Sequence, residues 1–405
     1  MAAVVLTFAA AAWFIFYWCM ANSAVQRADT AELALYLTQL APSDPQAHHR
    51  AAVLLEKNFD IENVQQAVVE YELAAALSPE NYMMWLDLGR ARERSGDPEG
   101  AERALRRALE LAPNYSRVQW GLGNALLRQG RVDEAFGHIG RSVTGDDALS
   151  GMAAVTAWQF FDGDLAAIRR AITGSVAFDA ALATHLAREK RFDEAIVMWD
   201  SLPANAQKGT LKQAGISLRG LLLEAKRFRQ ALRVAATLDD QAGEPGVVNN
   251  GGFEQPVKPD TPGPFEWQIT PGLQPQIVLT TAQKHGGDKS LLVIFNSADG
   301  KEFRPVAQTI AVEPGRSYTL ELYYRTELKT NASFSWEVLD ATDGKLIAAG
   351  EPIAGNTDWR SLVIRFVSNA SSDGVIIRFT RAPCTAVCPV AGNIWFDDVS
   401  LQQRN

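Results

Sequence analysis

A repeat of 34 residues runs through the N-terminal half of the chain and constrains its fold more than any other feature. The unit that starts at Tyr82 carries small, apolar and helix-breaking residues at fixed spacings: Trp85, Leu88, Gly89, Gly96, Ala101, Leu105, Ala108 and Pro113. A shift of 34 residues in either direction finds similar residue types, at Leu122, Gly123, Gly130, Ala135, Ile139 and Ser142, and at Leu54, Ala67, Tyr71, Ala74 and Pro79. Such a period predicts stacked units that bury one continuous core.

The residue types within one unit predict two helices joined by a turn. Gly89 and Ala101 are small enough to let the two helices approach closely. Gly96 breaks the first helix, because glycine readily takes the left-handed backbone conformation found after helix ends. Pro98 suits the first turn of the second helix, and Pro113 ends that helix.

Weaker copies of this pattern begin at Lys190 and Lys226, so the helical array is predicted over residues 23–242, with about six units and a degenerate one near 150–175. The array resembles the tetratricopeptide (TPR) repeat family, which implies a right-handed all-α solenoid that binds a protein partner. By this resemblance, the groove residues are Arg90, Arg94, Trp120, Asn124 and Arg128. The alternative is that these side chains form a solvated face together with Glu93.

The first residues form an uncharged apolar stretch from Ala2 to Met20. As a helix it would be about 28 Å long, close to the hydrocarbon thickness of a bilayer. We therefore predict that residues 1–22 are an N-terminal transmembrane helix, with a cleaved signal segment as the alternative. This anchor would make the membrane a partner through residues 2–20 and place the bulk of the chain on the extracytoplasmic side.

The pattern changes after a linker predicted at residues 243–248. Apolar and polar residues then alternate, as in 316–327 and 333–340, and Gly, Pro and Asp separate the alternating segments. Strict alternation is typical of strands with one buried face. The last two segments, 374–381 and 392–401, follow the same pattern. Residues 249–405 are therefore predicted to form an all-β antiparallel sandwich.

Four segments of this domain, in order, resemble the carbohydrate-binding modules with a galactose-binding-like jelly-roll fold: NNGGFEQP from Asn249, HGGDKSLLV from His285, VEPGRSYTLELYYR from Val312 and NIWFDDVSL from Asn393. The resemblance implies a structural calcium ion held by Glu254, Asp288 and Asp398. The alternative is that these carboxylates only cap strand ends.

Polar side chains on the strand face opposite the predicted core are the candidates for binding a glycan. They are Glu321, Tyr323, Arg325, Glu337, Arg365 and Arg378. Sugar rings need exposed aromatic faces, but Tyr323 is the only aromatic residue in this set, and Trp336 and Trp359 are assigned to the core side. A lattice of cross-strand ion pairs explains the same row equally well.

Composition and the remaining motifs narrow the function. The net charge of −8 argues against nucleic acid as a partner, since phosphate contacts need a basic surface. Cys384 and Cys388 are predicted to form a small disulfide in a loop outside the cytoplasm. The sequence has no phosphate-binding loop, HExxH or GxSxG motif, so no enzymatic activity is expected.

These features together predict a membrane-anchored, non-enzymatic adaptor of the cell envelope. Its TPR array would bind a protein and its sandwich a glycan, in surface-polysaccharide assembly or export. The alternative is a purely structural scaffold whose sandwich binds no sugar. An enzyme with a site between the domains is a third and weaker reading.

Overall fold

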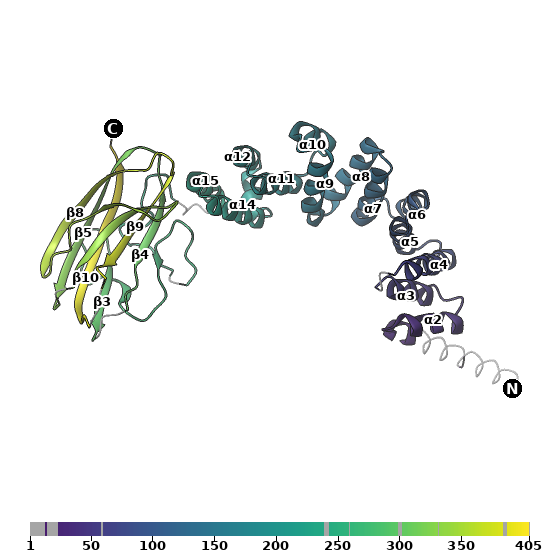
Figure 1. Cartoon of the computed structure of the whole chain (residues 1–405), viewed down its shortest axis with the longest axis horizontal. Coiled ribbons are helices and arrows are strands. Elements are labelled where there is room, and N and C mark those ends of the chain that lie inside the picture. The colour runs from purple at the N-terminus through teal and green to yellow at the C-terminus, as the bar shows by residue number, and fades with distance from the viewer. Residues whose placement is uncertain are drawn as a thin grey trace. The chain divides into compact units, whose positions relative to one another are not determined.

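The structure is a computed structural model that describes Trp13 and residues 23–57, 60–238, 243–258, 260–298, 302–330, 332–383 and 387–404. It shows helices followed by a two-sheet β-sandwich (Figure 1), as the sequence patterns indicate. The chain divides into two compact units, Met1–Phe178 and Asp179–Asn405. The second unit contains the last helices as well as the sandwich.

The helices pack mainly as antiparallel neighbours, with α3 against α4, α5 against α6, α7 against α8 and α14 against α15. Their bounds are α2 Ala31–Leu40, α3 Pro45–Leu55, α4 Ile61–Leu77, α5 Tyr82–Arg94, α6 Pro98–Leu111, α7 Ser116–Arg128, α8 Val132–Gly145, η1 Asp147–Leu149, α9 Ser150–Phe160, α10 Leu165–Ala171, α11 Val176–Arg188, α12 Phe192–Asp200, α13 Ala204–Lys208, α14 Lys212–Glu224 and α15 Phe228–Leu238.

The turns inside the hairpins follow the residues that the repeat places there. Gly96 and Gly130 have φ angles of +84° and +76°, which a glycine adopts at little cost. In the weaker repeats the same position holds Lys190 and Lys226, and both keep a left-handed backbone, with φ angles of 61° and 59°. The hairpin geometry is therefore retained where the glycine is not.

Close helix contact depends on glycine at one position of the repeat. A Cβ atom at Gly89 would lie 2.5 Å from the Leu105 side chain, and one at Gly123 would lie 2.7 Å from the Ile139 side chain. The two glycines are 34 residues apart, and each lies where the first helix of a hairpin crosses the second.

The sandwich consists of two five-stranded antiparallel sheets, with strand orders β1-β4-β9-β6-β7 and β2-β3-β10-β5-β8. The strands are β1 Gln268–Ile269, β2 Gln276–Thr280, β3 Ser290–Ser297, β4 Val306–Ala311, β5 Ser317–Leu328, β6 Phe334–Asp340, β7 Leu346–Ala349, β8 Thr357–Val367, β9 Gly374–Arg381 and β10 Val390–Gln403. We call them the first and the second sheet, in that order.

Aromatic and aliphatic side chains from both sheets fill the space between them. The strand alternation read from the sequence is confirmed on β5, where Tyr318, Leu320, Leu322 and Tyr324 are buried. On β6, Phe334 and Trp336 are fully buried. The core forms because residues two apart on a strand point to the same face.

Helix α15 is capped by a side chain of the sandwich. The Asp373 carboxylate accepts hydrogen bonds from the backbone N–H groups of Phe228 (2.9 Å) and Arg229 (3.2 Å), at the start of the helix. The Phe228 ring packs against Gly374, where a Cβ atom would come within 2.4 Å of it. The last helical hairpin and the sandwich thus share a packed contact within the second unit.

The predicted transmembrane helix has to be corrected. The prediction falls on residues 2–20, almost all of which lie outside the described residues. Among the helices that the structure describes, none is long and apolar enough to cross a bilayer. For example, α4 has 17 residues and contains Glu62, Glu70 and Glu72, whereas a span needs about 20 mostly apolar residues. The predicted single-pass localisation, with the bulk of the chain on the extracytoplasmic side, was inferred from that helix, and its single-pass anchor is corrected with the helix.

Candidate binding sites

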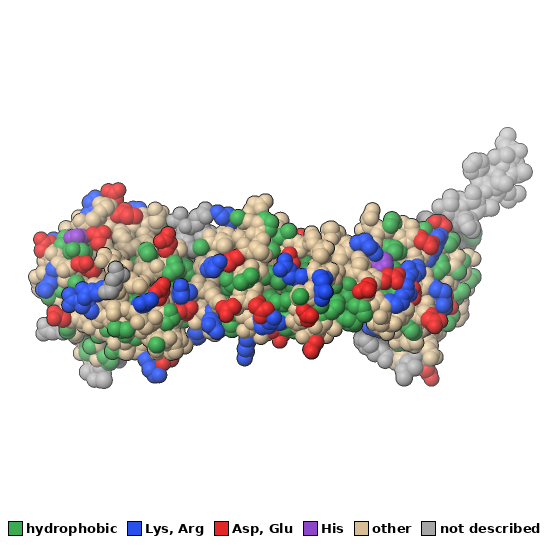
Figure 2. All heavy atoms as spheres, turned by 90° about the horizontal axis from the view of Figure 1, so that it is seen from above, with side chains coloured by type: hydrophobic (Ala, Val, Ile, Leu, Met, Phe, Trp, Pro, Cys, Tyr) green, Lys and Arg blue, Asp and Glu red, His purple; other side chains and the backbone are tan. Residues whose placement is uncertain are grey.

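The predicted groove residues of the helical array lie on α5 and α7, and their charges are compensated by acidic neighbours. Arg90 lies 3.6 Å from Asp87, Arg128 lies 3.2 Å from Glu93, and Arg94 pairs with Glu56. Asn124 donates a hydrogen bond to the Trp120 carbonyl within α7 (2.8 Å). The alternative in which Glu93 accompanies these residues thus has a direct contact behind it. Over the whole of the face seen in Figure 2, basic and acidic side chains are interspersed.

A polar network beside these residues was missed by the sequence analysis. His49 Nε2 lies 2.9 Å from Asp87, and Tyr71 donates a hydrogen bond to Glu56 (3.2 Å). Burial and the charges of Glu56 and Asp87 hold the Tyr71 pKa far above its usual range. The members of this network come from α3 and its C-terminal end, from α4 and from α5. Two residues in contact are up to 38 positions apart in the sequence. No local motif therefore signals this network.

The six predicted glycan-binding residues do not lie on one face. Glu321, Tyr323 and Arg325 lie on β5 and Arg365 on β8, all on the outer face of the second sheet. Glu337 on β6 and Arg378 on β9 lie on the outer face of the first sheet, where they form a 2.6 Å ion pair. Glu337 and Arg378 therefore follow the alternative prediction, in which the polar row consists of cross-strand ion pairs.

Three aromatic rings gather on the outer face of the second sheet. The His285 ring, from the loop between β2 and β3, stacks on Tyr323 with centroids 3.7 Å apart and planes 13° apart. Trp359 lies 5.7 Å from His285. Its assignment to the core side is wrong: Leu362, Ile364 and Phe366 point into the core, so Trp359 faces outward. We call His285, Tyr323 and Trp359 the aromatic cluster.

Arg325 extends the aromatic cluster with a second aromatic contact. Its guanidinium lies 6.0 Å from the centre of the Trp395 ring and is held by Asp358 (2.6 Å) and Glu327 (3.2 Å). Trp395 Nε1 and Arg325 Nε are buried and have no hydrogen-bond partner within the described residues. Because both donors are buried, they are not accessible to a sugar in this conformation.

The carboxylates predicted to bind calcium lie at the edge of the same sheet but do not converge. Glu254 accepts backbone hydrogen bonds from Asp288 (2.7 Å) and Lys289 (3.2 Å), while Asp398 contacts His285 Nδ1 (2.7 Å). The Asp288 side chain is 89% exposed and pairs with Lys284. Within the described residues, no group of three or more His, Cys, Asp or Glu side chains could hold a metal ion. Calcium binding stays a prediction that these contacts do not favour.

Asp397, beside Asp398, has a structural role. Its buried carboxylate accepts hydrogen bonds from the backbone N–H groups of His285 (2.8 Å) and Gly286 (3.1 Å), and burial raises its pKa. Since His285 belongs to the aromatic cluster, Asp397 positions the loop that presents the ring. The segment with His285 and the segment with Asp397 are more than 100 residues apart in sequence.

Of the two cysteines predicted to form a disulfide, Cys388 is disulfide-bonded in the structure. Cys384 lies outside the described residues, so the pairing itself stays a prediction.

A cleft of about 1130 Å³ lies within the second unit, between α12, α15 and loops of the sandwich. It is the place where an interdomain active site would be sought. Two carboxylates that line it are already engaged: Asp373 caps α15, and Asp193 accepts a hydrogen bond from Gln230 (2.6 Å). The third carboxylate that lines the cleft is Glu244.

Comparison with known proteins agrees with both resemblances. Residues 86–146 match a family model described as a tetratricopeptide repeat, and residues 246–385 match one described as a carbohydrate binding domain. The pre-mRNA-splicing factor clf1 of Aspergillus fumigatus is 33% identical over 91 residues, which are 21% of this chain and 14% of that protein. The chain thus spans a small part of this curated relative.

Solved structures similar to the sandwich include a CBM4 module (18% identity, TM-score 0.30, 39% of this chain and 99% of that chain). TmCBM61 in complex with β-1,4-galactotriose is another, with 15% identity and a TM-score of 0.29, over 38% of this chain and 96% of that chain. MamA is similar to the helical region, with 20% identity and a TM-score of 0.27, over 29% of this chain and 67% of that chain. Both matched families are non-catalytic; the first indicates protein interaction and the second carbohydrate binding. The chain therefore carries a tetratricopeptide repeat region followed by a carbohydrate binding domain.

Proposed function

We propose that the protein is a non-enzymatic adaptor whose helical array binds a protein partner and whose sandwich binds a glycan. The observation that carries the glycan half is the aromatic cluster, in which His285, Tyr323 and Trp359 lie together on the outer face of the second sheet. Pyranose rings stack on such faces, and Arg325, held by Asp358 and Glu327, lies on the same strand face. The protein partner would bind along α5 and α7, by exchanging its own charges for the ion pairs of Arg90, Arg94 and Arg128.

The proposal commits the glycan to the second sheet rather than the first. The outer face of the first sheet carries the paired Glu337 and Arg378, whose charges already satisfy each other. A sugar there would have to break an ion pair without gaining an aromatic surface from these two residues. Stacking of a sugar ring on the aromatic cluster would instead bury apolar surface, which is favourable by about 25 cal/mol per Å².

The test is affinity electrophoresis of the full chain in gels containing soluble xylan, β-1,4-galactan or a mixed-linkage β-glucan. We expect retardation by at least one of them, and about tenfold weaker binding in Tyr323→Ala and in Trp359→Ala. Glu337→Gln is the matched control on the first sheet and should bind like the natural protein. Calcium and chelator lanes test the predicted ion at the same time.

Two results would count against this function. If the folded protein binds none of a broad panel of polysaccharides, the glycan half fails and the protein is a scaffold for other proteins. If binding is lost in Glu337→Gln and retained in Tyr323→Ala, the glycan lies on the first sheet and the aromatic cluster is not the site.

A further inference from the structure

A cavity of about 480 Å³ in the first unit has a single charged group in its lining. It lies between the start of α7, the face of α8 and the segment after α10, and Asn114, Gln119, Gly140 and Thr144 are among the residues around it. Among the described residues that line it, Arg141 is the only one with a charged side chain. Most of its lining lies inside the region that matches the tetratricopeptide repeat model, whereas Ala171 and Thr173 lie beyond that region.

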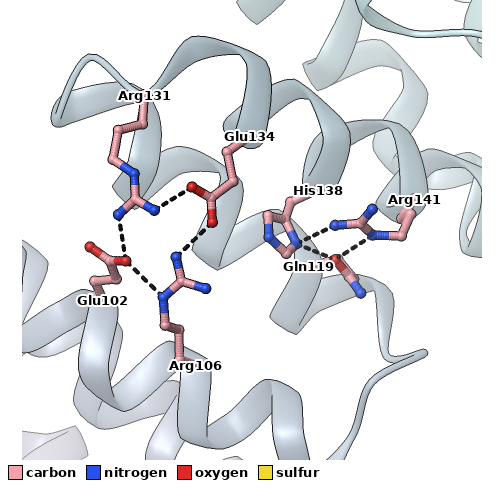
Figure 3. A network of polar contacts seen from close by, with 7 residues as sticks. All are labelled: Glu102, Arg106, Gln119, Arg131, Glu134, His138 and Arg141. Atoms are coloured by element: carbon pink, nitrogen blue, oxygen red, sulfur yellow. Dashed lines mark hydrogen bonds and ion pairs between the residues drawn. The ribbon is translucent and has the colours of Figure 1, made fainter.

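The hydrogen bonds around Arg141 leave part of its guanidinium without an acceptor (Figure 3). The Gln119 side-chain amide donates to the Pro113 carbonyl (2.6 Å), so its oxygen is the acceptor on the other side. That oxygen accepts from Arg141 Nε (3.2 Å) and lies 2.6 Å from His138 Nδ1. Arg141 Nη2 lies 2.9 Å from the same Nδ1, and Arg141 Nη1 forms no hydrogen bond within the described residues.

Nearby carboxylates do not compensate the charge of Arg141. Glu134, one turn before His138, is held in ion pairs with Arg106 and Arg131. Within the described residues Arg141 forms no ion pair, and its contacts are with an amide and an imidazole. Burial and the charge of Arg141 lower the His138 pKa to about 4, so that ring is neutral at pH 7. An arginine with unused donors is suited to bind an oxyanion through two parallel hydrogen bonds.

The helix surface beside Arg141 is bare. A Cβ atom at Gly140 would meet nothing within 4 Å, and one at Gly137 would meet only Arg141 Nη1, at 4.0 Å. Glycine inside a helix costs about 1 kcal/mol relative to alanine. Unlike Gly123, these two glycines have no packing partner in the described chain that requires them. They leave the helix surface next to the guanidinium open.

We propose that this cavity binds a carboxylate of an acidic peptide segment from the protein partner, with Arg141 as the anchor and the Gly137–Gly140 surface beneath the peptide backbone. This inference rests on the protein-binding half of the proposed function and adds a second contact surface to it. A peptide is favoured over an acidic glycan because the cavity belongs to the repeat region, and because the bare helix admits a polypeptide backbone.

The test measures fluorescence anisotropy of the full chain with a labelled, amidated peptide, Gly-Ala-Glu-Ala-Glu-Gly-Glu-Ala, and with the same peptide carrying Gln for Glu. We expect the Glu peptide to bind at least tenfold more tightly. Arg141→Gln should abolish that difference, Arg141→Lys should retain part of it, and Gly140→Leu should abolish binding while the cation stays. Arg103→Gln, an exposed arginine on α6, is the control and should bind normally.

The outcomes separate this inference from the proposed function. If the Glu peptide binds normally to the Arg141→Gln and Gly140→Leu variants but fails to bind to Arg94→Gln, the result contradicts the proposed cavity site. The proposed protein binding at α5 and α7 would still stand. If oligogalacturonate binds in a way that depends on Arg141 and the Glu peptide does not bind, the cavity is a site for an acidic glycan. The proposal that it binds a peptide is then wrong. Equal binding of the Glu and Gln peptides also overturns it. Circular dichroism of each variant shows that it is folded.

Discussion

Single glycines in the helical array have opposite roles, although their residue type is the same. Gly123 is in contact with Ile139 across the hairpin, whereas Gly140 faces open space on α8. We expect Gly123→Ala to lower the free energy of unfolding by about 1–3 kcal/mol, because the added methyl group has no room. Gly140→Ala should raise it by up to about 1 kcal/mol through helix propensity. Urea unfolding of both variants tests this, and equal effects would contradict the packing argument.

His138 makes the stability of the array depend on pH. Its pKa is lowered to about 4 in the folded protein, chiefly by burial and then by Arg141, while the unfolded chain titrates near 6.5. The unfolded chain therefore binds more protons between these values, and stability must fall as the pH drops from about 6.5 to 4. We expect a loss of about 1–2 kcal/mol, less than a fully buried ring would give because solvent screens part of the effect.

The control for that prediction is His138→Gln, which can still donate a hydrogen bond to Gln119 but does not titrate. Its free energy of unfolding, measured in urea at several pH values between 4 and 7, should have a shallower slope than that of the natural protein. Identical slopes would show that His138 is not the group responsible.

At the scale of elements, α6 and α8 are joined by a closed ring of four charged side chains (Figure 3). Arg106 contacts Glu102 (2.7 Å) and Glu134 (2.6 Å), and Arg131 contacts the same two glutamates. Exposed ion pairs contribute little to stability, so Glu102→Gln should lower the free energy of unfolding by less than about 1 kcal/mol. The cost should shrink further in 1 M NaCl, where charges are screened beyond about 3 Å. A cost that does not respond to salt would mean that packing, not charge, is lost.

The cap between Asp373 and α15 connects an element of the helical array to the sandwich. Asp373→Ala removes the acceptor for two backbone N–H groups and should therefore lower the free energy of unfolding by about 1 kcal/mol. The amides of Phe228 and Arg229 should exchange with solvent faster in this variant. Asp343→Ala, whose carboxylate serves only its own turn at Lys345, is the control. Unchanged exchange at Phe228 would show that the cap does not hold the helix.

At the scale of the whole molecule, the net charge of −8 decides which polymers the protein can bind. Binding to nucleic acid depends on replacing counterions with Lys and Arg side chains. We expect no binding of a 30-base-pair DNA duplex or of a single-stranded RNA at about 150 mM salt, as measured by fluorescence anisotropy. Salt-dependent binding to either would reveal a basic surface that the composition does not indicate.

Local features of the fold were predictable because they depend on residues close in sequence. The repeat identified the hairpins from Gly89, Gly96 and Gly123, whose roles follow from steric contact and backbone angle. Alternation identified the buried faces of β5 and β6. The candidate glycan site was predicted only in part, since Tyr323 and Arg325 lie in it while Glu337 and Arg378 lie on the other sheet.

The sequence by itself therefore determined the two classes of structure, the repeat register and the inward side of regular strands, all of which depend on short-range spacing. Tertiary structure decided which strands share a sheet, and so separated Arg378 from Arg365. It also brought His285 onto Tyr323 and left Arg141 without a carboxylate beside a bare helix face. These contacts join residues far apart in the chain, and strand order and helix crossing, not local spacing, bring such residues together.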